Sequence, residues 1–515
     1  MLTYEIKNGH AVVTGYELSA TAEQLSNIEI PARYKLFKVT EIGPKAFCGC
    51  TQIESIMLPD TINTIGDSAF LCSSLRWIGC GSTRFEDKEN GISCVAVQTI
   101  GKRAFCHTAL EDVILQTPDS RLEVGEYAFA DGRQLRNVVF QTADRVKLGK
   151  GCFSKSGIQT AVLPRNGALE VIPEECFLGC VQLRSVSFRD VRRIERNAFL
   201  GCKELRYLSL DGLEKIGDSA FNLCCSLKEV AIPDSCMQYA RSAFQSAGIE
   251  SFTVDPQNPM FCSENGVIFS KDKTRLLSFP PARGGSYMIP DGTIAIGEKA
   301  FYDSHLMDIG FPESLRVIED NAFDGADNLV DVYLPDNIKE IREAVLAHCH
   351  KLYSLSLPPV KLDWEDVLYG TCVREIHFRG SKEEYDRLVT GELVNEPALF
   401  FLDTDGREYH HIARRGKTLQ FEYSILSGGG VRIDKISPLF SKVVVPEMLE
   451  DHYVVEIAFG AFPEFTTEVF IPNTVQQTPD AFAYCAGALK HISIPFDISI
   501  EPATIPKDCV VERRI

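Results

Sequence analysis

The chain has 515 residues, a formal net charge of −18 at pH 7 and an isoelectric point near 5.1. This acidity argues against nucleic-acid binding, which requires a basic surface, and the basic clusters are only dipeptides such as Arg192-Arg193. No uninterrupted apolar stretch of about 18 residues occurs, so the sequence predicts no membrane-spanning helix.

Residues 1–41 are expected to form an N-terminal cap ahead of a repeat array. They contain short β-type runs at 4–6, 11–13 and 28–30, and Pro31 closes the last run. Because these runs lack the spacing of the later repeats, we expect them to cover the first coil of the array.

From residue 42 onward, a phenylalanine recurs behind a small residue, most often after 22 to 24 residues. A fixed period of this length is typical of a solenoid of stacked coils rather than a closed globule. The thirteen positions are Phe47, Phe70, Phe105, Phe129, Phe153, Phe177, Phe199, Phe221, Phe244, Phe301, Phe323, Phe462 and Phe482.

Each phenylalanine lies in a longer unit, seen most clearly in residues 194–210. An aliphatic residue stands five positions before the aromatic, and a glycine such as Gly101 often follows it, where we expect the chain to turn. Three aliphatic residues follow with the spacing i, i+3, i+5, as at Leu205, Leu208 and Leu210. This L-x-x-L-x-L pattern predicts one short parallel strand per repeat, and hence a β-rich leucine-rich-repeat solenoid curved into a right-handed horseshoe.

The unit, written I-G-x-x-A-F-x-x-C-x-x-L-x-x-I-x-L-P, resembles the BspA-like leucine-rich repeat of bacterial surface proteins. A segment from Asn258 to Thr274 resembles the hairpin insertion of that family, and its turn residues Asn265-Gly266 and Lys271-Asp272 agree with a hairpin. The resemblance covers most of the chain. It implies binding, including cell adhesion, and carries over no catalytic residue.

The repeats place the main array at residues 42–380, with insertions at 81–99 and 255–290. These insertions interrupt the period, so we expect them to project as loops from one side of the array.

Residues 381–420 contain no repeat aromatic and are expected to form a connector. Ser381 followed three residues later by Glu384 is a capping-box pattern, which predicts a short helix, and a hairpin is expected at 402–410. Residues 421–515 show a second cap pattern and then further repeats, which predicts a second, shorter array.

Cysteine often occupies the third position after the repeat aromatic. Serine, threonine or alanine fills the same position elsewhere, so the position requires a small side chain. We interpret its cysteines as structural thiols, with disulfides or metal ligation as the alternatives. These cysteines are Cys50, Cys180, Cys202, Cys224 and Cys485, together with Cys349, which stands three residues after Leu346, the residue that replaces the aromatic in its repeat.

The location predicted from the sequence is cytoplasmic. Residues 1–16 lack the charged and apolar regions of a signal peptide, and many free thiols favour a reducing compartment. The alternative is a protein at the cell surface or secreted by another route.

The sequence predicts no metal, cofactor or catalytic site. Cys48-x-Cys50 and His348-Cys349-His350 lack a second ligand pair at zinc-binding spacing. Residues 403–406 lack the remaining ligands of a calcium loop, and the nucleophile-elbow and H-E-x-x-H signatures do not occur. We therefore predict a protein that is not an enzyme; the remote alternative is a hydrolase built in residues 381–420.

Binding is expected on the strand face, where the second and fourth residues after the first aliphatic of each triplet point outward. The early repeats place methionine, tryptophan and aliphatic residues there, types that interface cores favour. The predicted partner-binding residues are Met57, Trp77, Ile114, Val139, Val162 and Tyr207. The alternative is that they pack under the 81–99 insertion or against the cap.

We therefore expect a non-catalytic scaffold that binds a protein partner on the strand face of the solenoid. The alternative function is a surface adhesin that binds a host protein or a glycan. The residues do not identify the partner or the oligomeric state.

Overall fold

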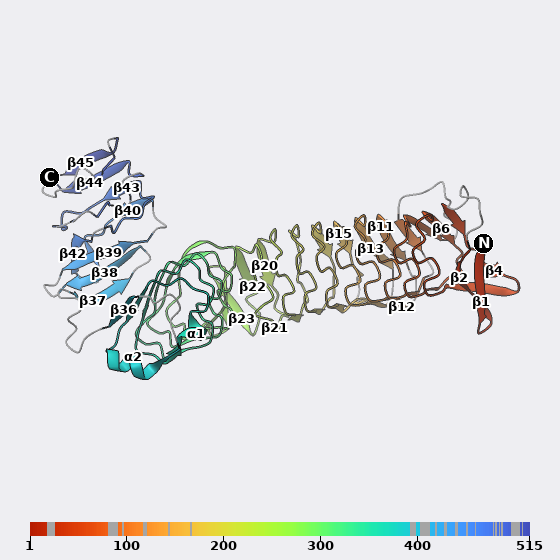
Figure 1. The fold of residues 1–515 in the computed structure, drawn as a ribbon, viewed down its shortest axis with the longest axis horizontal. Helices are drawn as coiled ribbons and strands as arrows, with labels where there is room; N and C mark the ends of the chain where they lie inside the picture. Colours follow the sequence, from red (N-terminus) through yellow and green to blue (C-terminus); the bar gives the residue numbers. More distant parts are fainter. Residues whose placement is uncertain are drawn as a thin grey trace. The chain divides into compact units, whose positions relative to one another are not determined.

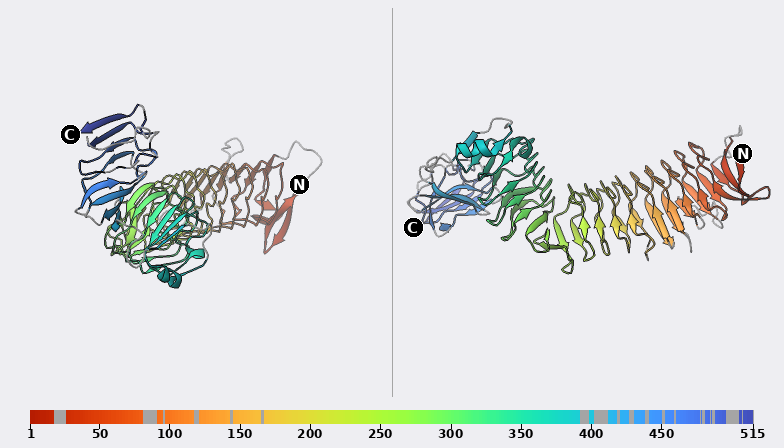
Figure 2. Two further views of the ribbon diagram at one scale, coloured as in Figure 1. Left: turned by 60° about the vertical axis from the view of Figure 1, so that its left-hand side comes forward. Right: turned by 90° about the horizontal axis from the view of Figure 1, so that it is seen from below.

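The computed structural model folds the repeats into stacked coils of short strands (Figures 1 and 2). It divides into two compact units, Met1–Arg283 and Gly284–Ile515. The structure describes residues 1–17, 26–80, 91–94, 97–116, 121–142, 145–164, 167–391, 398–401, 412–417, 420–426, 430–437, 441–449, 452–458, 460–476, 478, 481–483, 485, 488–495, 505–506 and 508–514.

The first unit begins with an antiparallel hairpin, whose second strand starts a parallel ladder. Along this side of the coils the strands form two successive sheets, one of eight strands and one of four, and most of the strands are only two residues long. They are β1 (Leu2–Lys7), β2 (His10–Tyr16), β4 (Arg33–Tyr34), β5 (Phe37–Ile42), β7 (Thr64–Ile65), β10 (Thr99–Ile100), β12 (Arg121–Val124), β14 (Arg145–Leu148), β16 (Val171–Ile172), β18 (Arg193–Ile194), β19 (Lys215–Ile216) and β21 (Gln238–Tyr239).

On the other side, a sheet of eight strands and a separate sheet of two hold the strands predicted from the aliphatic triplets, together with one strand from the cap and one from the 81–99 insertion. They are β3 (Asn27–Glu29), β6 (Ser55–Leu58), β8 (Trp77–Cys80), β9 (Gly91–Cys94), β11 (Asp112–Gln116), β13 (Asn137–Thr142), β15 (Thr160–Val162), β17 (Ser185–Ser187), β20 (Glu229–Ile232) and β22 (Ser251–Val254). Most coils thus carry two strands. The sequence pattern predicted the triplet strand; the second one forms at the aliphatic residue before the phenylalanine.

The core of the first unit is a file of phenylalanine rings. Nine of them, from Phe47 to Phe244, stack in order with centroids 5.1 to 5.6 Å apart and interplanar angles of 3 to 15°. The prediction that Phe177, Phe199 and Phe221 share one file is confirmed. The file ends at Phe244, whose ring meets Phe252 at an interplanar angle of 61°.

The glycine before the phenylalanine has a different role from the one predicted. Gly101 and Gly125 are not among the glycines with positive φ, so no special turn conformation requires them. A Cβ on Gly125 would lie 2.6 Å from the backbone of Gly101 in the preceding coil. Glycine is therefore found here because successive coils approach closely.

The left-handed conformation occurs instead two residues before the aromatic, as at Arg103, and again two residues after it. Cys72, His107 and Asp131 occupy the position after the aromatic in three consecutive coils, with φ values of 57°, 58° and 56°. Their amides donate to carbonyls of the next coil, for example His107 N to Ala130 O at 3.0 Å. The side chains at this position therefore form a row along one rim of the unit.

The predicted hairpin insertion closes the first unit. It consists of β23 (Phe261–Glu264), β24 (Val267–Ser270) and β25 (Arg275–Ser278), and its first turn is at Asn265-Gly266. Asn258, which is 0% exposed, anchors it: Nδ2 donates to Pro233 O (2.7 Å) and Cys236 O (2.8 Å). Its Oδ1 accepts hydrogen bonds from the backbone amides of Met260 and Phe261, both at 2.9 Å.

The second unit continues the repeats. Its parallel strands are β26 (Gly285–Met288), β27 (Ala295–Ile296), β28 (Leu306–Gly310), β29 (Val317–Ile318), β30 (Asp331–Tyr333), β31 (Glu340–Ile341), β32 (Ser354–Leu357), β33 (Leu362–Asp363), β34 (Glu375–Phe378), β35 (Val389–Thr390) and β36 (Ala398–Phe401). Two helices interrupt them, α1 (Trp364–Val367) and α2 (Lys382–Leu388). The capping box of Ser381 and Glu384 at the start of α2 is confirmed.

The second unit also holds an antiparallel group followed by parallel strands. The strands are β37 (Ile412–Lys417), β38 (Phe421–Leu426), β39 (Val431–Ile436), β40 (Lys442–Val444), β41 (Met448–Leu449), β42 (His452–Ile457), β43 (Glu468–Phe470), β44 (His491–Pro495) and β45 (Val510–Arg514). The rings of Phe462 and Phe482 stack at 4.8 Å. The hairpin expected at 402–410, with its turn at 403–406, lies outside the described residues.

Candidate partner-binding face

The triplet strands of the first unit form a face with one apolar row. Strands β11, β13 and β15 pair in parallel, and their register places Ile114 beside Val139 and Val139 beside Val162. All three side chains are half-buried. The structure thus brings together three of the predicted partner-binding residues on adjacent strands.

Met57 and Trp77 do not join this row directly. Met57 is half-buried, and the register separates it from Ile114 by Gly79 on β8 and Ser93 on β9. Trp77 lies in the other row, beside Ser55, and is only 4% exposed. The prediction that Trp77 offers an exposed ring is therefore corrected: the residue is buried, although the alternation of β8 places it on the face opposite the core residue Ile78.

A polar row runs beside the apolar one. Asn137 Nδ2 donates to Asp112 Oδ1 at 2.6 Å, and Thr160 Oγ1 donates to Asn137 Oδ1 at 2.7 Å. The row continues through Ser185 to Tyr207, which is 77% exposed. These cross-strand bonds fix the side chains of the row, so the face is ordered before any partner arrives.

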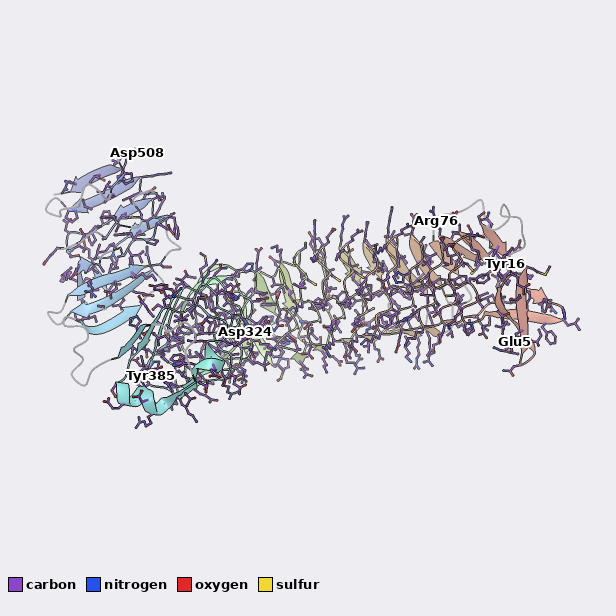
Figure 3. All side chains as sticks on the ribbon, in the orientation of Figure 1. Glu5, Tyr16, Arg76, Asp324, Tyr385 and Asp508 are labelled. Atoms are coloured by element: carbon purple, nitrogen blue, oxygen red, sulfur yellow. The ribbon has the colours of Figure 1, made fainter. Side chains whose placement is uncertain are left out.

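A groove of about 510 Å³ borders the face where the strands begin. Four of its residues each stand immediately before a strand: Arg76, Glu111, Arg136 and Gln159. Backbone bonds stack them, since Arg136 N donates to Glu111 O (2.6 Å) and Gln159 N donates to Arg136 O (2.7 Å). The remaining lining residues are Arg133, Gln134, Gly157 and Gln182; Arg76 is labelled at the rim in Figure 3.

The groove is basic although the chain is acidic. Arg76, Arg133 and Arg136 are exposed, and no ion pair between described residues involves them. Elsewhere along the same rim, Arg184 pairs with Glu204 at 3.0 Å. Free guanidinium groups are suited to carboxylates, which they bind in a bidentate manner. The sequence analysis missed this groove because it considered only the second and fourth positions after the first aliphatic residue of each triplet. Arg76 and Arg136 stand at the first position after that residue.

The small-residue position after the aromatic has a hydrogen-bonding role. The thiols of Cys180, Cys202 and Cys224 donate to carbonyls of Phe153, Phe177 and Phe199 in the preceding coils, at 3.0, 3.2 and 3.3 Å. All three cysteines are free and buried, which confirms the structural thiols predicted there. Burial raises the pKa of the Cys180 thiol to about 12.

The structure also shows the bonding of the His348-Cys349-His350 turn and of Cys80. In the His348-Cys349-His350 turn, the imidazoles bond to Asp324 (2.8 Å) and Asp327 (2.7 Å) of the preceding coil. Cys80, which lies outside the small-residue position, is in a disulfide bond.

Among the described residues, no helix has the length and apolarity that a bilayer crossing needs.

No curated protein sequence matches the chain. Several solved structures are similar to it. A leucine-rich cell surface protein from Faecalibacterium prausnitzii is 18% identical, with 76% of this chain and 96% of that chain covered and a TM-score of 0.42.

The pneumococcal vaccine antigen PcpA is 19% identical, with 79% and 93% covered and a TM-score of 0.34. A leucine-rich repeat protein from Eubacterium ventriosum is 14% identical, with 97% and 94% covered and a TM-score of 0.32. We draw nothing about function from similarities of this size.

The repeats themselves match a family model. The model, described as the BspA type leucine rich repeat region, matches residues 20–92, 85–167, 146–264 and 285–386, which together are more than half of the chain. The match spans the phenylalanine file of the first unit and the strands of the second unit as far as β34. The chain belongs to the BspA-type leucine-rich-repeat family.

Proposed function

We propose that this chain is a non-catalytic scaffold that binds a protein partner on the face formed by β11, β13 and β15 and in the adjoining groove. The family consists generally of interaction or surface proteins. The observation that carries the proposal is the apolar row of Ile114, Val139 and Val162 next to a groove with unpaired arginines. An apolar centre with a polar rim is the arrangement of protein interfaces.

The side chains of the face indicate which residue types the partner segment carries. The apolar row suits an aliphatic or aromatic anchor, and the guanidinium groups of Arg76, Arg133 and Arg136 suit carboxylates beside that anchor. We therefore infer a partner segment with acidic residues flanking apolar ones. Tyr207, at the far end of the polar row, extends the same surface.

This proposal includes the division of the chain described from its sequence: a cap at 1–41, an array at 42–380, a connector at 381–420 and a second array at 421–515. We do not propose the hydrolase in 381–420, because this family is generally not enzymatic.

The experiment starts with affinity purification from the native source to identify the partner. Binding is then measured with Val139→Glu, which places a charge in the centre of the apolar row, and with Arg136→Glu, which reverses a charge in the groove. We expect each to weaken binding at least tenfold while the thermal midpoint stays within the error of the parent. The matched control is Ala231→Glu, at an exposed strand position of β20.

Equal binding by Val139→Glu and the control would contradict the proposal. A reduced thermal midpoint in Val139→Glu would show that the row packs against the protein itself.

A surface adhesin remains the second candidate, because Cys80 is in a disulfide bond and disulfides persist in oxidising compartments. The free buried thiols favour the reducing interior. Labelling of intact native cells with a membrane-impermeant reagent decides between them: label on this chain supports the surface, and label only after lysis supports the interior.

A further inference from the structure

A cluster on the rim of the first unit holds three side chains that commonly bind metal ions. The Cys106 sulfur, a ring nitrogen of His107 and a carboxylate oxygen of Asp131 all lie within 4.8 Å of one another. Cys106 is 6% exposed, Asp131 is half-buried and His107 is exposed. The three atoms therefore meet where the core reaches solvent.

The repeat holds these ligands in place. His107 and Asp131 stand two residues after the aromatics of consecutive coils, and both have the left-handed backbone described above. The coils are tied at this point by the 3.0 Å bond from His107 N to Ala130 O. Stacking thus brings residues 24 positions apart in sequence into one cluster, without any loop that must fold around an ion.

The spacing within the cluster fits an ion better than a hydrogen bond. His107 Nε2 and Asp131 Oδ2 are 3.6 Å apart, which is too long for a hydrogen bond. Two ligands that each lie about 2.1 Å from one tetrahedral zinc ion are separated by about 3.4 Å. By contrast, His348 holds the equivalent position in the second unit and bonds directly to Asp324 at 2.8 Å, which leaves no room for an ion.

A further cysteine follows in the stacking order. Cys72 occupies the same rim position in the preceding coil, and its amide donates to Cys106 O at 3.0 Å. Its side chain is exposed and its sulfur is a free thiol. Cys72 is not among the three side chains whose ligand atoms lie within 4.8 Å of one another, so water is the fourth ligand available to an ion.

We propose that Cys106, His107 and Asp131 form a binding site for a transition-metal ion, with Zn²⁺ as the best chemical match. A thiolate, an imidazole and a carboxylate are the ligands that zinc takes in proteins, whereas calcium and magnesium prefer oxygen ligands alone. The fourth position is filled by water, since the cluster is open to solvent at His107. A bound ion joins the coils of Phe105 and Phe129 and stabilises them by mass action.

The test uses the full chain with the exposed Cys48, Cys225 and Cys372 replaced by serine, so that these thiols do not bind metal. Co²⁺ is the probe, because it reports thiolate ligation through a sulfur-to-cobalt charge-transfer absorption. We expect one equivalent of Co²⁺ to bind with this absorption, and one equivalent of Zn²⁺ to displace it.

Single substitutions assign the ligands. Cys106→Ser is expected to abolish the charge-transfer absorption, and His107→Ala and Asp131→Ala are expected to weaken Co²⁺ binding at least tenfold. His348→Ala is the matched control and is expected to bind Co²⁺ like the parent. Zn²⁺ should raise the thermal midpoint of the parent and of the control but not that of His107→Ala.

Three results would overturn the site: no stoichiometric binding, an absorption that survives in Cys106→Ser, or equal affinities in the parent and His107→Ala. If Cys106→Ser does not fold, His107→Ala and Asp131→Ala decide the matter, because their side chains are not part of the core.

Discussion

The Cys202 thiol donates a hydrogen bond to the main-chain carbonyl oxygen of Phe177, 3.2 Å away in the preceding coil. A small donor at this position therefore joins two coils as well as filling the space between them. We expect Cys202→Ser to keep most of the stability, since a hydroxyl can donate in the same way. Cys202→Ala should lose about 1 kcal/mol, and Cys202→Val about 1 to 3 kcal/mol through overpacking.

Urea unfolding at neutral pH measures these differences. An alanine variant as stable as the parent would show that the thiol acts by its size alone.

Alkaline pH should destabilise the chain through its buried thiols. Burial raises the pKa of Cys349 from its ordinary value of 9.0 to about 12. Between these values the unfolded thiol loses its proton and the folded one keeps it, so stability is complete below pH 9 and falls as the pH rises toward 12. The loss is about 1.4 kcal/mol per pH unit for each such thiol.

Unfolding experiments between neutral pH and pH 11 measure how the free energy of unfolding falls with pH. In Cys349→Ser this slope should be shallower by the contribution of one thiol. An identical slope in that variant would exclude ionisation of Cys349 as a cause.

The phenylalanine file predicts how core damage spreads. Phe199 stacks on Phe177 at 5.3 Å and on Phe221 at 5.4 Å. Phe199→Ala should cost about 3 to 5 kcal/mol because it leaves a cavity between two rings. Hydrogen exchange should speed up in the coils on both sides as well as in the altered one, since each coil contacts its neighbours. Exchange that changes only in the coil of Phe199 would contradict this coupling.

Asn258 should be among the most sensitive polar residues. Its amide makes four hydrogen bonds in a site with no exposure, so Asn258→Ala leaves several buried groups without partners. We expect a loss of at least about 3 kcal/mol, measured by thermal and urea unfolding.

Asn258→Asp is the informative companion. It keeps the acceptor for the amides of Met260 and Phe261 but sets a carboxylate against the carbonyls of Pro233 and Cys236. It should therefore not rescue stability. Wild-type stability of the aspartate variant would mean that the carbonyl contacts contribute nothing.

Trp77→Ala should behave as a core substitution. With 4% of the residue exposed, we expect a loss of about 3 to 5 kcal/mol of stability. Partner binding by the folded fraction should remain close to that of the parent, in contrast to Val139→Glu. A Trp77→Ala variant that is as stable as the parent but does not bind the partner would show that Trp77 belongs to the binding surface.

The repeat made the core of the first unit predictable, because the same aromatic recurs from coil to coil and successive rings stack on one another. The row of Ile114, Val139 and Val162 followed from strand alternation. The burial of Trp77 could not be predicted from the repeat. Its strand β8 pairs with β9, which lies in the 81–99 insertion, where no repeat pattern indicates a strand. The cluster of Cys106, His107 and Asp131 was also invisible, because its spacing is one coil and not a familiar ligand motif.

The stack also tolerates uneven spacing along the chain. Phe70 and Phe105 are separated by 35 residues, yet their rings lie 5.2 Å apart and 4° from parallel, as do neighbours only 23 residues apart. Length added between two rings is thus absorbed without moving either of them. Foreign peptides, tags or recognition sequences could be grafted at this junction, and the family can gain new specificities there while the spine stays unchanged.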